Sequence, residues 1–161
     1  MDKKENAIIC DIDGCLIQTD WIFNDAKRLG LNGEETFTLF DLYANDIMNS
    51  VDKNLVLTIK LLNFDKKIIF LTARSEDIRE RTRKNLERIL PGVSFLLCMR
   101  PSDDKRPQKA VKEDYLRTIT EHYNVVLAID DSAENCAVFE KHDIPYIQWK
   151  FGEQNEINRP H

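Results

Sequence analysis

Short apolar runs alternate with amphipathic stretches along the chain. Five runs are apolar enough to form buried strands, and segments of helical period separate most of them. The predicted strands are residues 7–11, 67–72, 94–99, 125–129 and 145–148. The predicted helices are residues 34–49, 53–63, 76–89, 108–122 and 133–142. This order predicts an α/β fold, with a five-stranded parallel sheet and helices on both of its faces.

The length of the chain predicts one domain over residues 1–161. About 55 residues separate the first two predicted strands, which is more than one crossover helix needs. We expect residues 17–50 to form a small helical lid segment, so that the site has a small cap or none. The tail after Gln148 lacks a packed-core pattern and is expected to be loosely held.

Charge is distributed unevenly along the chain. The formal net charge is −5, yet residues 74–112 contain 11 Lys or Arg residues against 6 Asp or Glu residues. One interpretation is a solvated helix face with ion pairs at helical spacing. The other is a basic groove wall that attracts a phosphorylated substrate. Both interpretations remain open at this stage.

Apolar content and cysteine spacing narrow the class of protein. No apolar stretch approaches the roughly 20 residues of a membrane span, and the N-terminus lacks the apolar core of a signal peptide. The four cysteines show no metal-binding or redox spacing. They are Cys10, Cys15, Cys98 and Cys136. We therefore expect a cytoplasmic protein with reduced thiols and no membrane partner. Cys15 is a poor candidate nucleophile, because neighbouring acids disfavour a thiolate.

The first apolar run ends in two acids and a glycine, Asp11-Ile12-Asp13-Gly14. Open parallel sheets bind ligands at the carboxyl ends of their strands. Side chains at i and i+2 of a strand share a face, and glycine permits a sharp turn beside them. Two close carboxylates need a cation or a shared proton, so the pair predicts a metal ion. Mg²⁺ is favoured, because it prefers oxygen ligands. The alternative is an ordinary turn that uses Asp and Gly.

Two later strand ends carry related chemistry. The second predicted strand ends in Thr72-Ala73-Arg74 before a helix, where a hydroxyl, free amides and a guanidinium would cradle a phosphate. The fourth ends in Asp130-Asp131, whose carboxylates would complete a metal site. Helix capping is the alternative explanation at both places.

Together these segments resemble the four motifs of the haloacid dehalogenase superfamily. Those motifs are Asp-x-Asp-Gly, a Ser or Thr that ends the second strand, a Lys, and a closing acidic pair. In this chain they stand in the same order as residues 11–14, Thr72, Lys112 and Asp130-Asp131. The resemblance implies a Rossmann-like three-layer sandwich and Mg²⁺-dependent phosphoryl transfer.

The resemblance also implies a role for each motif residue. Asp11 would be the nucleophile that forms an aspartyl-phosphate, and Asp13 would act as general acid and then as general base. Thr72 and Lys112 would hold the phosphoryl oxygens. Asp13 would also bind the metal through its backbone carbonyl. The full set of implied metal ligands is Asp11, Asp13, Asp130 and Asp131.

A second resemblance concerns the substrate. Residues 98–107, 111–113, 126–131 and 144–148 are similar to the 3′-phosphatase domain family of bacteriophage polynucleotide kinases, and this similarity spans roughly residues 65–150. The residues then expected to bind substrate are Gly14, Thr72, Ala73, Arg74, Arg106 and Lys112. One departure is Gln108, which stands where those phosphatases tend to have an acid, four residues before the motif lysine.

These resemblances imply a phosphomonoester hydrolase, and three functions remain open. The first is a 3′-phosphatase acting on nucleic-acid or nucleotide 3′ ends. The second is a phosphatase of small metabolites such as mononucleotides, and the third is a non-enzymatic phosphate-binding module. Kinase activity is not expected, because the chain has no Gly-x-x-x-x-Gly-Lys-Ser/Thr phosphate loop.

Overall fold

A parallel sheet forms the centre of the molecule. The computed structural model describes residues 2–153 and 157–158. The parallel strands are β1 (Glu5–Cys10), β2 (Lys67–Ser75), β3 (Phe95–Arg100), β4 (Tyr123–Asp130) and β5 (Tyr146–Gln148). Their order is β3-β2-β1-β4-β5, which confirms the predicted five-stranded parallel sheet. A short antiparallel strand, β6 (Ile157–Asn158), pairs with β5 and was not predicted.

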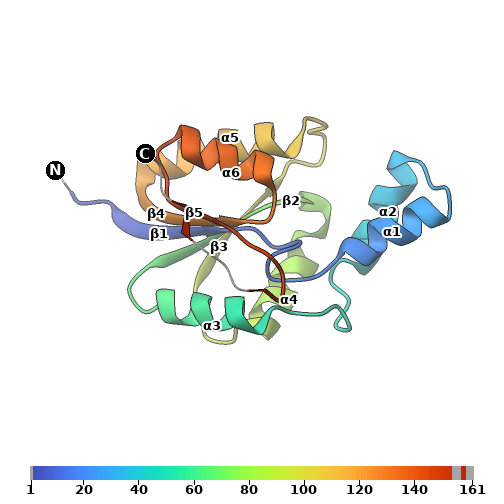
Figure 1. The fold of residues 1–161 in the computed structure, drawn as a ribbon, viewed down its shortest axis with the longest axis horizontal. Helices are drawn as coiled ribbons and strands as arrows, with labels where there is room; N and C mark the ends of the chain where they lie inside the picture. The colour runs from blue at the N-terminus through green and yellow to red at the C-terminus, as the bar shows by residue number, and fades with distance from the viewer. Residues whose placement is uncertain (1, 154–156, 159–161) are drawn as a thin grey trace.

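Helices cover both faces of the sheet and make the predicted three-layer α/β sandwich (Figure 1). On one face lie α3 (Lys53–Leu62) and α4 (Arg79–Ile89), and on the other lie α5 (Gln108–His122) and α6 (Ala133–Lys141). A short 3-10 turn, η1 (Glu76–Ile78), leads into α4. Within the described part of the chain, no helix has the length and apolar character that crossing a membrane requires.

The central strand separates two hydrophobic cores by simple alternation. Ile8 and Cys10 pack in the cluster that includes side chains of α3 and α4. Ala7 and Ile9 pack in the cluster that includes side chains of α5 and α6. Because successive strand residues point to opposite faces, a strand covered on both sides reads as a continuous apolar run. Both faces of β1 thus pack in the hydrophobic core, so that the residues free to form a site are those that follow its carboxyl end.

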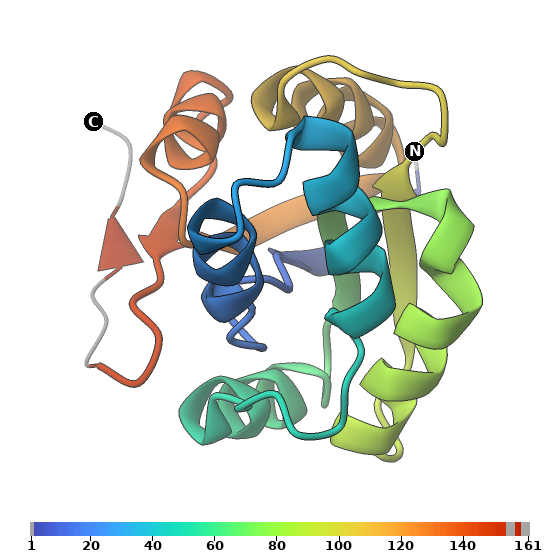
Figure 2. The same ribbon diagram turned by 90° about the vertical axis from the view of Figure 1, so that its right-hand side faces the viewer.

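A helical segment projects from the body between β1 and β2. It comprises residues 19–45 and contains α1 (Asp20–Arg28) and α2 (Gly33–Tyr43), which pack on each other. Figure 2 looks onto this end of the molecule and shows both helices in front of the strands. Ile22, Phe40 and Ala44 of the segment cluster with Ile78 and Met99 of the body. The segment is therefore attached to the body through a small apolar contact of its own.

The helix expected over residues 34–49 ends earlier, at Tyr43. The carbonyl of Ala44 accepts a hydrogen bond from the Arg74 guanidinium at 3.1 Å, and the side chain of Asn45 also bonds to Arg74. These contacts with a residue of β2 draw the chain out of the helical path. The sequence pattern of α2 gives no sign of them.

The expectation of a loosely held tail is wrong for its first residues. Trp149 is buried, and its amide donates to the carbonyl of Asp130 at 2.9 Å. Its indole N–H donates to Asp52, which also accepts from the amide of Gly152. Beyond this point, residues 157–158 form β6, whereas residues 154–156 and 159–161 lie outside the described part. The beginning of the tail is thus tied to the strand that carries the acidic pair.

Candidate active site

The carboxyl ends of β1, β2 and β4 bring the motif residues together. β1 lies between the other two strands, and Cys10 aligns with Phe70 on β2 and with Ile129 on β4. Asp11 follows directly, and its amide donates to the carbonyl of Ile129 at 2.8 Å. Asp130 is the last residue of β4. The parallel register therefore places Asp11 beside Asp130 at the edge of the sheet.

Lys112, from α5, lies between these two carboxylates and is 1% exposed. Its Nζ is 3.1 Å from Asp11 Oδ1 and 2.6 Å from Asp130 Oδ2. Burial alone would lower the pKa of Lys112, but the charges of Asp11 and Asp130 outweigh burial and raise it. Lys112 therefore remains a cation at neutral pH and offsets part of the negative charge at this edge.

Negative charge nevertheless exceeds positive charge around Asp11. Burial raises the pKa of Asp11 well above its ordinary value, Asp130 adds to the rise, and Lys112 opposes it. Burial, followed by the charge of Asp130, raises the pKa of Asp131 to about 6. Three carboxylates thus lie near one buried ammonium, which pairs with Asp11 and Asp130. This imbalance is what a bound cation would correct.

The two acids of the closing pair have different surroundings. Asp130 is buried and accepts hydrogen bonds from the Asn135 amide at 3.2 Å and from the Ser132 backbone N–H at 3.0 Å. The carboxyl group of Asp131 instead lies against Gly14, where a Cβ would stand 2.2 Å from Asp131 Oδ2. Gly14 also has a φ of +78°, which side-chain-bearing residues rarely adopt. The turn thus favours glycine there, and a side chain at this position would force the Asp131 carboxyl group to move.

A set of potential ligand atoms surrounds this point. One oxygen each from Asp11 and Asp131 and the sulfur of Cys15 lie within 4.8 Å of one another. Carboxylate oxygens suit a hard cation such as Mg²⁺. Burial, followed by the charge of Asp11, raises the pKa of the Cys15 thiol, so that a thiolate is disfavoured. The donors present thus fit a hard divalent ion held by the two carboxylates.

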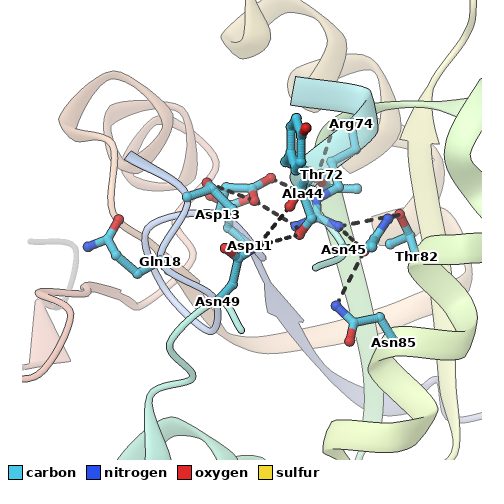
Figure 3. Close-up of polar contacts among 12 residues, drawn as sticks. Asp11, Asp13, Gln18, Ala44, Asn45, Asn49, Thr72, Arg74, Thr82 and Asn85 are labelled. Atoms are coloured by element: carbon cyan, nitrogen blue, oxygen red, sulfur yellow. Dashed lines mark hydrogen bonds and ion pairs between the residues drawn. The ribbon is translucent and has the colours of Figure 1, made fainter. Parts of the chain in front are cut away.

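Asp13 points toward a different partner. Arg74 binds both of its carboxylate oxygens, with Nε at 2.9 Å and Nη2 at 2.8 Å (Figure 3). The other N–H contacts of Arg74 go to the Ala44 carbonyl, the Asn45 side chain and the Thr82 hydroxyl. A guanidinium has five N–H donors, and five contacts are present. In this arrangement Arg74 has no N–H left for a substrate phosphate, which runs against its predicted substrate contact.

The remaining predicted substrate ligands are placed differently from one another. Thr72 is fully buried, and its hydroxyl accepts the Arg74 amide at 3.1 Å, which leaves its O–H as a donor. The carbonyl of Ala73 accepts from Arg100. Arg106 is half exposed and pairs with Asp104 at 2.8 Å and with an acid of α5. The contacts of Arg106 thus join it to other acids and not to Asp11 or its neighbours.

Several polar residues of this site were missed in the sequence. They are Thr19, Asn45, Thr82, Asn85 and Asn135. Asn135 had a signal, because it is a polar residue in the first turn of a helix that follows the acidic pair. Asn45 had none, since its partner Arg74 lies 29 residues away in the sequence. Pairings over such separations do not leave a local pattern.

Comparison with known proteins identifies the family. The family model described as polynucleotide kinase PNKP phosphatase domain matches residues 5–153. No curated protein matches the chain significantly. A chain of the Pnkp1/Rnl/Hen1 RNA repair complex is similar, with 22% identity and a TM-score of 0.70. The match covers 94% of this chain and 44% of that chain, so this chain spans less than half the length of that neighbour.

Other solved structures share the fold at lower similarity. The class C acid phosphatase from Bacillus anthracis is 19% identical with a TM-score of 0.62, over 83% of this chain and 54% of that chain. A haloacid dehalogenase-like hydrolase from Streptococcus pneumoniae is 17% identical with a TM-score of 0.62, over 93% of this chain and 88% of that chain. The chain thus belongs to the polynucleotide kinase PNKP phosphatase-domain family, within the haloacid dehalogenase superfamily, and is a phosphoric monoester hydrolase.

Proposed function

We propose that this chain is a Mg²⁺-dependent phosphatase that works through an aspartyl-phosphate on Asp11 and acts on 3′-phosphorylated ends of nucleic acids or nucleotides. The observation that carries the proposal is the position of Asp11. It stands at the carboxyl end of the central strand, 3.1 Å from the buried ammonium of Lys112 and close to Asp131. Lys112 and a bound cation would favour the ionised form of this carboxylate, which is oriented and adjacent to groups that bind phosphoryl oxygens.

The reaction is a pair of in-line displacements at phosphorus. In the first, a carboxylate oxygen of Asp11 bonds to phosphorus, the bond to the leaving oxygen breaks, and Asp13, which must be protonated for this step, gives that oxygen its proton. In the second, water bonds to phosphorus, Asp13 takes the water proton, and the bond from phosphorus to Asp11 breaks. Phosphate leaves and both aspartates return to their starting states. Lys112 and the O–H of Thr72 would hold the phosphoryl oxygens during both steps.

Of the four acids predicted as metal ligands, Asp11 and Asp131 are the two whose carboxylates would hold the ion. The carboxylate of Asp130 is occupied by Lys112 and Asn135, so we assign it the task of orienting Lys112. Asp13 is paired with Arg74, and we keep only its backbone carbonyl as a ligand. When bound, Mg²⁺ would supply positive charge toward the phosphoryl oxygens and balance the excess acids.

The 3′ end as substrate is supported by the family match and by the similarity to a chain of an RNA repair complex. The test is phosphate release from a 3′-phosphorylated oligonucleotide, its 5′-phosphorylated isomer and a 3′-mononucleotide, with Mg²⁺ or with EDTA. Asp11→Asn is the blank. We expect Mg²⁺-dependent release from the 3′-phosphorylated oligonucleotide in preference to its isomer.

Each other outcome has a definite meaning. Equal or faster release from the mononucleotide would replace the nucleic-acid substrate with a small metabolite. Undiminished release in EDTA would contradict the metal requirement, and undiminished release by Asp11→Asn would contradict the aspartyl-phosphate. Salt dependence of the oligonucleotide reaction adds a second criterion, because each phosphate contact releases counterions and steepens the fall of affinity with salt.

A further inference from the structure

Both ends of the helical segment are linked to Asp13, the proposed general acid. The first end contacts Asp13 directly, and the second contacts it through Arg74. At its start, Thr19 occupies the N-cap position of α1 but makes no capping hydrogen bond with its side chain. Its hydroxyl instead donates to Asp13 Oδ1 at 3.0 Å. A hydroxyl at the N-cap normally accepts a backbone N–H and stabilises the helix, and here that contact is absent. The hydroxyl of Thr19 therefore bonds to Asp13 and does not cap α1.

At the other end of the segment, three residues surround Arg74. The Asn45 side chain accepts from Nη1 at 2.5 Å and the Ala44 carbonyl accepts from Nη2 at 3.1 Å. The ring of Phe40 lies 5.7 Å from the guanidinium carbon, within the range of a cation–π contact. Arg74 in turn binds both oxygens of Asp13 (Figure 3). A guanidinium held on all sides fixes the plane of the carboxylate it binds.

The body of the molecule holds the same arginine less completely. Thr82 of α4 accepts from Nη1 at 3.4 Å, and it also accepts from the Asn45 amide at 3.1 Å. Asn45 is thus the residue that joins the helical segment, Arg74 and α4. If Asn45 were truncated, one Arg74 N–H and the Thr82 hydroxyl would both lose a partner in a buried place, and the guanidinium would be free to turn.

We propose that Asn45 is a positioning residue for the general acid, acting through Arg74, and that the helical segment sets the orientation of Asp13 from its two ends. This inference rests on the proposed function, because it gives Asp13 the proton-transfer role. It differs from a merely structural role in what it predicts. A positioning residue affects the reaction where proton donation matters, whereas a loss of folded protein affects all substrates equally.

Leaving-group dependence separates the two roles. The ratio kcat/KM reports the steps up to release of the leaving group, which is where Asp13 donates its proton. A nitrophenolate leaves without much help, whereas an alkoxide needs the proton. For Asn45→Ala we expect kcat/KM to fall on the order of tenfold with a nucleoside 3′-phosphate and by less than about twofold with p-nitrophenyl phosphate. Asn45→Asp, which keeps the acceptor for Arg74, should restore part of the loss.

Two further variants keep the test decisive. Thr82→Val preserves shape and removes the hydroxyl shared by Asn45 and Arg74, so it should give the same leaving-group pattern in a weaker form. Asn63→Ala is the matched control, because Asn63 bonds to the Lys66 and Ser94 carbonyls near the start of β2 and β3. It should not alter the ratio between the two substrates.

The possible failures can be told apart. Equal losses with both substrates, or no loss in Asn45→Ala and Thr82→Val, would overturn the positioning role while the phosphatase function stands. A wild-type protein that hydrolyses neither ester would end both the proposed function and this inference. The Arg74 Nε–H resonance, assigned with Arg74→Lys, gives a readout without activity. It should shift or broaden in Asn45→Ala and stay unchanged in Asn63→Ala, and an unchanged resonance in both would contradict the proposal.

Discussion

Arg74 and Arg83 make similar contacts in very different surroundings. Arg74 holds both oxygens of Asp13, a residue far away in sequence, and its side chain is fully buried. Arg83 pairs with Glu80 and Glu87 one turn away on α4, and its side chain is 41% exposed. Exposed ion pairs within a helix add little to the stability of the folded protein. Removing one member of a buried ion pair is strongly destabilising, because the other charge is left buried without a partner. Arginine thus forms a surface ion pair at position 83, whereas at position 74 it holds a residue of the site in place.

This comparison also bears on the two interpretations of the basic stretch at residues 74–112. Arg79 pairs with Glu76 at 2.6 Å, and Arg106 pairs with Asp104, in the same manner as Arg83. These local ion pairs favour the solvated helix face over a basic groove wall. Arg74 belongs to the same basic stretch, but its charge is paired with that of Asp13. A local charge count therefore says little about substrate attraction until the pairing is known.

The largest effect is expected at the buried lysine. Lys112→Met would leave Asp11 and Asp130 as buried carboxylates without their shared cation. We expect a loss of about 3–5 kcal/mol in the free energy of unfolding. Phosphatase activity should fall below detection, because the phosphoryl oxygens and the acids both lose their ammonium. Urea unfolding followed by circular dichroism, with an activity assay beside it, checks both. A variant of unchanged stability would contradict the account of this edge.

The next effect separates the two acids of the closing pair. Asp131→Asn should weaken activation by Mg²⁺ on the order of a hundredfold, because a carboxylate ligand is replaced by a neutral amide. Its stability should be retained, because the Asp131 side chain is exposed and the substitution leaves no buried group without a partner. Titration of activity with Mg²⁺, together with a melting curve, tests this. Unchanged Mg²⁺ activation would remove Asp131 from the metal site.

A smaller effect is expected at Arg74. Arg74→Met would leave the Asp13 carboxylate without its main partner, but Asp13 is 24% exposed and can recruit water. We therefore expect a loss of about 3 kcal/mol, toward the low end for a broken buried pair. Activity should also fall, more for alkyl than for nitrophenyl esters. Denaturant unfolding gives the first value, and a stability equal to that of wild type would show that the buried contact is dispensable.

The smallest effect completes the comparison. Arg83→Met removes an exposed arginine that contacts only acids of its own helix among the contacts described. We expect no resolvable change in the melting midpoint or in kcat/KM, and no change in the salt dependence of an oligonucleotide reaction. A marked loss of oligonucleotide turnover in this variant would restore the basic groove wall as the better interpretation.

The elements that could be predicted from the sequence are those with a local pattern of apolar residues or a local motif. The apolar runs located β1, β2, β3, β4 and β5, because strands buried on both faces carry a continuous pattern. Parallel register places Asp11 beside Asp130, and α5 adds Lys112 between them, so the structure brings these three motif residues together. The partners of Arg74 and the burial of Trp149 could not be predicted from the sequence. Both depend on pairings between distant segments that no local periodicity records.

The same limit explains why Arg74 was expected to bind substrate. From its place after Thr72, at a strand end and before a helix, a phosphate contact is the natural inference. Only the fold brings Ala44 and Asn45 over the guanidinium and turns Asp13 toward it. The substrate contact of Arg74 thus stays a prediction, and in this structure its N–H groups bond to other partners.

The central claim is that the carboxylate of Asp11 takes the phosphoryl group, and trapping that group tests it most directly. Wild-type protein is mixed with a 3′-phosphorylated oligonucleotide and Mg²⁺, quenched in acid within one turnover, digested and examined by mass spectrometry. We expect a phosphate adduct on Asp11 that is absent with EDTA and absent in Asp11→Asn. Phosphate release without any adduct, together with an active Asp11→Asn protein, would contradict the account.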